Sequence, residues 1–129
     1  MKPLTEEWRV KAEGDFVTAQ RELRARKAPN YDAACFHAQQ CIEKYLKAIL
    51  QEHEIAIGKT HNLVAILEKI IPIYPGLEHL RAPLQDLNAY AIDFRYPGES
   101  ADREIATRAV SLCRAVRRAL LDEFFTQEG

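Results

Sequence analysis

One long stretch, residues 30–54, constrains the fold of this chain more than any other. Apolar residues recur in it at three- and four-residue spacing, and neither glycine nor proline interrupts the run. They are Tyr31, Ala34, Cys35, Ala38, Ile42, Tyr45, Leu46 and Ile49. This spacing predicts a helix with one apolar stripe, and Asn30 stands where an N-cap is expected. Such a helix needs several other elements to cover it.

The rest of the chain also has helical periodicity. Apolar spacing predicts helices over about 5–26, 63–71, 83–94 and 101–125, the last of them capped by Ser100. The residues predicted to be buried in the last helix are Ile105, Ala109, Leu112, Val116, Leu120 and Phe124. No stretch alternates like a strand. The sequence therefore predicts an all-α, up-and-down bundle of about five helices, with residues 1–129 forming a single domain.

The composition fits a compact domain rather than a nucleic-acid coat. Apolar residues make up 47% of the 129 positions, charged residues 29%, and the formal net charge is -1. No apolar signal segment opens the chain, and no run is apolar enough to span a bilayer. Cys35, Cys41 and Cys113 lie within helical patterns, which favours buried reduced thiols. We therefore expect a cytoplasmic protein.

Four motifs in order along the chain carry a resemblance to a known family. They are the first-helix residues Ala12, Asp15, Phe16 and Ala19, the run FHAQQCIEKYLKA at 36–48, the turn KTHNL at 59–63, and DFRYP at 93–97. Together they resemble HEPN domains, small helical proteins associated with nucleotides. The resemblance implies a helical bundle that commonly forms homodimers and is often paired with a small nucleotidyltransferase protein.

Many HEPN proteins are ribonucleases, and their signature is an arginine followed, after four to six intervening residues, by a histidine. None of His37, His53, His61 and His79 has an arginine at that distance upstream. We therefore expect no catalytic residues and favour a non-catalytic module that binds a nucleotide or a protein partner. A ribonuclease toxin of a toxin–antitoxin module, with a degenerate active site, is the alternative. A structural scaffold without a ligand is a third.

The residues expected to bind a ligand lie on the polar arc of the long helix and after the fourth helix. No glycine-rich phosphate loop, metal motif or cofactor motif is present, so phosphate would need side-chain cations. The candidates are Arg95, Lys44 and Lys47, with Tyr96 available for stacking on a base. Gln40 and His37 share the polar arc and complete the predicted site.

Two further patterns have more than one interpretation. Arg95 pairs with Asp93 or Glu43 if it is structural. The last helix has a basic side formed by Arg103, Arg114, Arg117 and Arg118, which we interpret as a solvated face.

Apolar residues left over by one layer of helices predict a homodimer interface. Those residues are Tyr74, Leu77, Phe94 and Phe125.

Overall fold

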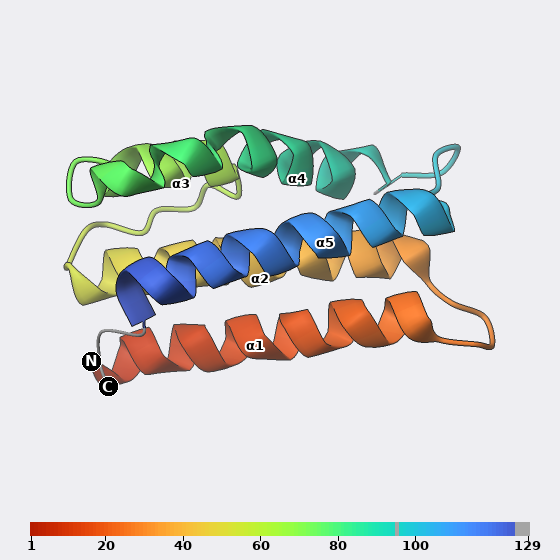
Figure 1. Ribbon diagram of the computed structural model, residues 1–129, viewed down its shortest axis with the longest axis horizontal. Helices are drawn as coiled ribbons and strands as arrows, with labels where there is room; N and C mark the ends of the chain where they lie inside the picture. Colours follow the sequence, from red (N-terminus) through yellow and green to blue (C-terminus); the bar gives the residue numbers. More distant parts are fainter. Residues whose placement is uncertain (95, 126–129) are drawn as a thin grey trace.

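A computed structural model describes residues 1–94 and 96–125, and helices form all of the regular structure in this part (Figure 1). The α-helices are α1 (Pro3–Arg24), α2 (Tyr31–Glu52), α3 (Leu63–Ile70), α4 (Arg81–Asp93) and α5 (Arg103–Leu120). A 3-10 turn, η1 (Pro75–Leu80), precedes α4, and a π-helical turn, η2 (Leu121–Phe125), follows α5. The predicted all-α fold is confirmed.

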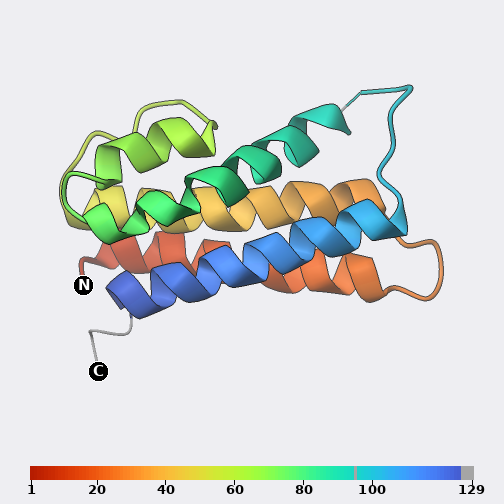
Figure 2. The same cartoon turned by 45° about the horizontal axis from the view of Figure 1, so that its top comes forward.

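Helix α2 is the centre of the bundle, as its long apolar stripe predicted. It contacts all four other α-helices, with α1 and α5 along one side and the α3–α4 pair along another (Figures 1 and 2). From Ala34 to Ile49 every residue of the predicted stripe is fully buried. The Asn30 side chain accepts a hydrogen bond from the Ala33 N–H at 2.9 Å, so the predicted N-cap is also correct.

The short helices are positioned by caps and turns. The Asn62 side chain accepts hydrogen bonds from the N–H groups of Val64 and Ala65 and so starts α3. Helix α4 begins at Arg81, after a short turn as predicted, and holds Pro83 in its first turn, where no intrahelical N–H donor is needed.

The start of α5 differs from the prediction. Asp102, not Ser100, is the N-cap, and its carboxylate accepts a hydrogen bond from the Ile105 N–H at 2.8 Å. The preceding Ala101 N–H donates instead to the Asp32 carboxylate at 2.7 Å. This bond ties the loop to the first turn of α2.

The buried face of α5 is also rotated from the predicted one. Ala106, Ala109, Val110, Cys113, Val116 and Leu120 are buried. Ile105, Leu112 and Phe124, which were predicted to be buried, are only half-buried at the edges of the core. Small side chains at 106, 109 and 113 allow α5 to approach α2 closely, and the larger ones flank that contact.

The polar arc of α2 is largely covered by α1 and by the loop before α3. Gln39, Glu43 and Lys47 are all buried. Of the predicted interface residues, Leu77 and Phe125 are buried within the chain, where the Phe125 ring packs against Tyr45 with ring centroids 5.3 Å apart.

The three cysteines are free and buried, as predicted. Burial raises the pKa of the Cys35 thiol to about 12, so it stays protonated. Among the described residues, no helix combines the length and the apolar character needed to cross a membrane.

Candidate functional site

The strongest concentration of buried polar groups surrounds the Glu43 carboxylate on α2. One of its oxygens accepts hydrogen bonds from the Lys47 ammonium and from His61 Nδ1, each at 3.0 Å. The other oxygen accepts from the Gln39 amide at 3.1 Å, and the Gln40 amide lies 3.5 Å from it. The Glu43 side chain is only 4% exposed, so these donors replace the water that the carboxylate loses.

The charge state of Glu43 follows from this arrangement. Burial on its own would raise the pKa of the carboxyl group. Hydrogen bonds from His61, Lys47 and Gln39 favour the carboxylate more strongly, and the pKa lies below its usual value. Glu43 is therefore an anion at neutral pH, and Lys47 is the cation that balances it.

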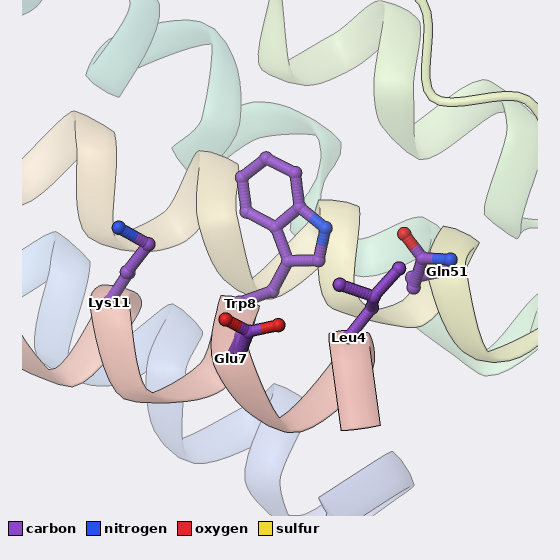
Figure 3. Close-up of a pocket in the computed structure, with 5 residues that line it drawn as sticks. All are labelled: Leu4, Glu7, Trp8, Lys11 and Gln51. Carbon is purple, nitrogen blue, oxygen red and sulfur yellow. The ribbon is translucent and has the colours of Figure 1, made fainter. Parts of the chain in front are cut away.

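Trp8 of α1 shields this ion pair from one side. Its indole rises from α1 toward α2, with Leu4 and Gln51 on one side of it and Lys11 on the other, as Figure 3 shows. The Lys47 ammonium lies 5.9 Å from the centre of the indole ring. The hollow beside Trp8 has a volume of about 300 Å³, but the buried polar groups around Glu43 do not line it. We therefore interpret it as a packing feature of α1 on α2.

His61 connects the buried Glu43 carboxylate to a groove on the surface. The His61 side chain is 72% exposed, and Nδ1 is held by Glu43. Nε2 makes no hydrogen bond to any residue in 1–94 or 96–125. The groove has a volume of about 220 Å³ and is lined by Gln39, His61, Asn62, Asn88, Ala91 and Ile92.

The amides in this groove are held in fixed orientations. Asn88 of α4 accepts a hydrogen bond from the Leu63 N–H at 3.0 Å and donates one to Asn62 at 2.9 Å. Gln39 donates to the His61 carbonyl at 3.1 Å as well as to Glu43. Amide groups from α2, the start of α3 and α4 thus surround an apolar wall together with one imidazole. We take this groove as the candidate functional site.

A second polar cluster lies between α1 and α2. The Asp15 carboxylate of α1 accepts hydrogen bonds from His37 Nδ1 at 2.7 Å and from the Lys44 ammonium at 2.6 Å. Gln40 belongs to the first cluster, where it donates to the Gln39 side chain at 2.9 Å. The four predicted ligand-binding residues of α2 therefore divide between two carboxylates: His37 and Lys44 lie at Asp15, and Gln40 and Lys47 lie beside Glu43.

The structure does not leave the two lysines free for a phosphate. Lys44 is paired with Asp15, and Lys47 with Glu43. Tyr96 is 66% exposed and lies beyond the end of α4. Arg95 lies outside the described residues. Ligand binding by these predicted residues stays a prediction.

Four polar residues of the groove were not among the predicted ligand-binding residues: His61, Asn62, Gln39 and Asn88. His61 and Asn62 could have been found from the run KTHNL. Gln39 could have been found from the double Gln39-Gln40, because a polar pair on a buried helix needs hydrogen-bond partners. Asn88 carried none, since its role depends on how α4 packs over the start of α3. No group of three or more His, Cys, Asp or Glu side chains within the described part of the chain could hold a metal.

Comparisons with known proteins identify the family of this chain. The chain is similar to TT1696 from Thermus thermophilus, whose crystal structure matches with a TM-score of 0.79 and 23% identity. The match covers 93% of this chain and 98% of the other, and it shows a shared fold. A search of curated proteins gave no match. The sequence model of the HEPN domain matches residues 5–123. The chain therefore belongs to the HEPN domain family, which supports a function related to nucleotides or RNA.

Proposed function

We propose that this chain is a non-catalytic HEPN protein that binds a nucleotide in the groove beside His61. The observation that carries the proposal is the convergence of the Gln39, Asn62 and Asn88 amides and an exposed imidazole on one apolar wall. The Asn62 side-chain NH2 and His61 Nε2 make no hydrogen bond within residues 1–94 and 96–125, so both can meet polar atoms at the edge of a base. A volume of about 220 Å³ holds a base and leaves ribose and phosphates outside.

The residues after α4 extend this proposal. Arg95 and Tyr96 follow the groove residue Ile92 closely in the chain. An arginine there would meet a phosphate with its planar fork, and the exposed Tyr96 ring would stack on a base. Lys44 and Lys47 contribute indirectly, because they neutralise the carboxylates that orient His37 and His61.

Assembly belongs to the same proposal. HEPN domains often dimerise, and we propose a homodimer for this chain, with a small nucleotidyltransferase as a further candidate partner. Ile92 of the groove wall has an exposed apolar side chain, and so does Phe36 of α2. A partner seated on Ile92 would close one side of the groove.

Calorimetry with ATP, GTP and AMP tests the groove directly. The variant Ile92→Glu places a negative charge on the groove wall, so it should weaken binding at least about tenfold through repulsion of the phosphates. Light scattering checks that the variant keeps the mass of the unmodified protein, which separates this effect from a change in assembly. Gln85→Glu is the matched control: it adds the same charge to an exposed position of α4, outside the groove. If the two variants bind the nucleotides with equal affinity, the site lies elsewhere. If the unmodified chain binds no nucleotide at low salt, the proposal is refuted.

One observation favours the ribonuclease alternative. The Glu43–His61 pair holds one ring nitrogen on a carboxylate and leaves the other toward solvent, an arrangement that can transfer protons. We nevertheless expect the chain to leave RNA intact, because no arginine stands at the signature distance before a histidine. The test is incubation with total RNA and defined oligonucleotides without added metal. Cleavage that His61→Gln, His37→Ala or Arg95→Ala abolishes would establish the alternative.

A further inference from the structure

Six exposed cations lie along the second half of α1, the loop after it and α5. They are Arg21, Arg24, Arg26, Lys27, Arg103 and Arg114. None of their side chains forms an ion pair or hydrogen bond with any residue of the described segments 1–94 and 96–125. Most other arginines of the chain are paired: Arg9, Arg81, Arg108, Arg117 and Arg118 each lie beside a carboxylate. The charge of these six cations is therefore not neutralised by an ion pair with any carboxylate of the described residues.

The contact between Glu13 and Arg117 fixes how the cations of α1 and α5 line up. Arg117 Nε donates to the Glu13 carboxylate at 2.7 Å, and its guanidinium lies 4.4 Å from the centre of the Phe16 ring. The two helices run antiparallel and side by side (Figure 1). Residues that follow Glu13 on α1 therefore lie beside residues that precede Arg117 on α5.

From that anchor, the arginines of both helices follow one seam. Arg21 and Arg24 come about two and three turns after Glu13 on α1. Arg114 comes about one turn before Arg117 on α5, and Arg103 stands at its first turn. At about 1.5 Å per residue, Arg103 and Arg114 are separated by about 16 Å along the axis. The seam is thus a strip of positive charge several phosphates long, not a point site.

The α1 side of the seam is hollowed and carries few acids. A depression of about 460 Å³ is lined by Val17, Gln20, Arg21, Arg24 and Ala25. Arg26 and Lys27 extend the positive charge into the loop between α1 and α2. Within residues 20–28 Glu22 is the one acid against four cations. A polar side chain and an apolar floor between arginines fit a ligand that presents phosphates and sugars.

We infer that the α1–α5 seam, defined by Arg21, Arg24, Arg103 and Arg114, binds the phosphodiester backbone of RNA. Unpaired arginines offer bidentate hydrogen bonds to phosphate oxygens without first breaking an internal ion pair. This inference goes beyond the nucleotide groove, which recognises a base and is lined by α4 rather than α5. Arg103 and Arg114 of the basic side of the last helix, interpreted above as solvated, then have a ligand, whereas Arg117 and Arg118 are paired with carboxylates.

Fluorescence anisotropy with a labelled single-stranded RNA of about 20 nucleotides, long enough to follow the strip, tests the inference across a salt series. The variant Arg24→Gln/Arg114→Gln removes one cation from each side of the seam. It should weaken binding roughly tenfold and reduce the slope of log affinity against log salt by about 1.4, which is two phosphate contacts on a single strand. Circular dichroism melts verify that the variant is folded.

The matched control is Lys11→Gln/Lys59→Gln, which removes two exposed cations outside the seam that, like the seam arginines, form no ion pair with any described residue. It should bind RNA like the unmodified chain. Equal weakening by both variants, or no RNA binding at low salt, would overturn the inference. The inference would also be overturned if poly-glutamate of the same charge bound as tightly as RNA, because the seam would then be a site for acidic protein segments.

The two proposals fail in different ways. Mononucleotide binding by calorimetry reports the groove, and the seam variant should leave it unchanged. Ile92→Glu should weaken mononucleotide binding while the seam retains most of its salt-dependent affinity for RNA. If the unmodified chain binds RNA but no mononucleotide, the groove proposal is refuted. If the seam variant binds RNA as tightly as the unmodified chain, the seam proposal is refuted.

Discussion

At the scale of single residues, the Glu43 carboxylate and the Lys47 ammonium are each tolerated in the interior because the other is there. Their side chains are 4% and 7% exposed. Burial of one charge without its partner is costly, whereas a pair with satisfied hydrogen bonds comes close to balancing its desolvation. No buried polar side-chain atom lacks a hydrogen-bond partner among the described residues. These hydrogen bonds therefore fix the rotamers that shape the groove.

Replacing Glu43 by Gln should cost about 3 kcal/mol of unfolding free energy or more, because the Lys47 charge would remain buried without an anion. The double variant Glu43→Gln/Lys47→Met should recover much of this loss. Urea melts of the three proteins measure it. A single variant as stable as the unmodified chain would mean that Lys47 escapes to solvent and that the pair does not hold the core.

The same carboxylate predicts a dependence of stability on pH. Because the pKa of Glu43 is lower in the folded chain than its usual value of 4.5, its contribution is complete above that value. It is lost as the pH falls through the folded pKa, since the protonated acid no longer balances Lys47. Melts between about pH 6 and pH 3 should show a smaller acid loss in Glu43→Gln/Lys47→Met than in the unmodified chain. Equal losses in the two proteins would assign the acid sensitivity to other carboxylates.

At the scale of elements, apolar spacing was enough to predict the helices but not every face or end. The stripe of α2 was predicted correctly because its core residues are regularly spaced and mostly large. The face of α5 was missed by part of a turn, since Ala106 and Cys113 are small and contribute little to an apolar pattern. The cap at Asp102 is local and was missed, although Asp is a preferred N-cap residue. The hydrogen bond that holds the preceding loop could not be predicted, because Ala101 and Asp32 are 69 positions apart in the chain.

The candidate site was only partly predictable, because it depends on contacts between residues that are far apart in the chain. The sequence placed His37, Gln40, Lys44 and Lys47 on one helix, which the structure confirms. The four-residue spacing of Glu43 and Lys47 on one helix was a local signal for their pairing, but the sequence could not show that Asp15 of α1 neutralises Lys44. The pairing with Asp15 depends on how α1 packs on α2, and the groove needs Asn88 from α4 to meet the start of α3. No local pattern encodes either contact.

At the scale of the whole molecule, exposed apolar side chains gather near the start of α2 and the end of α4. Phe36, Ile92 and Tyr96 are exposed. A hollow of about 380 Å³ in this region is lined by Asn30, Asp32, Ala33, Phe36, Ala91 and Phe94. Leu77 and Phe125, which were expected at an interface, are instead buried inside the bundle. Phe94 alone of the predicted interface residues lines this hollow.

We expect a homodimer that uses this surface. Large apolar side chains grouped around a hollow bury their area when a second copy covers them. Phe36→Asp should therefore convert the dimer to a monomer, because it would place a charge without a partner in the centre of the contact. Ile73→Asp is the matched control, since it charges another exposed apolar residue in the turn before η1, far along the chain from the hollow. Size-exclusion chromatography with light scattering gives the masses. A monomer at micromolar concentration, or a dimer that both variants leave intact, would show that the hollow is not the interface.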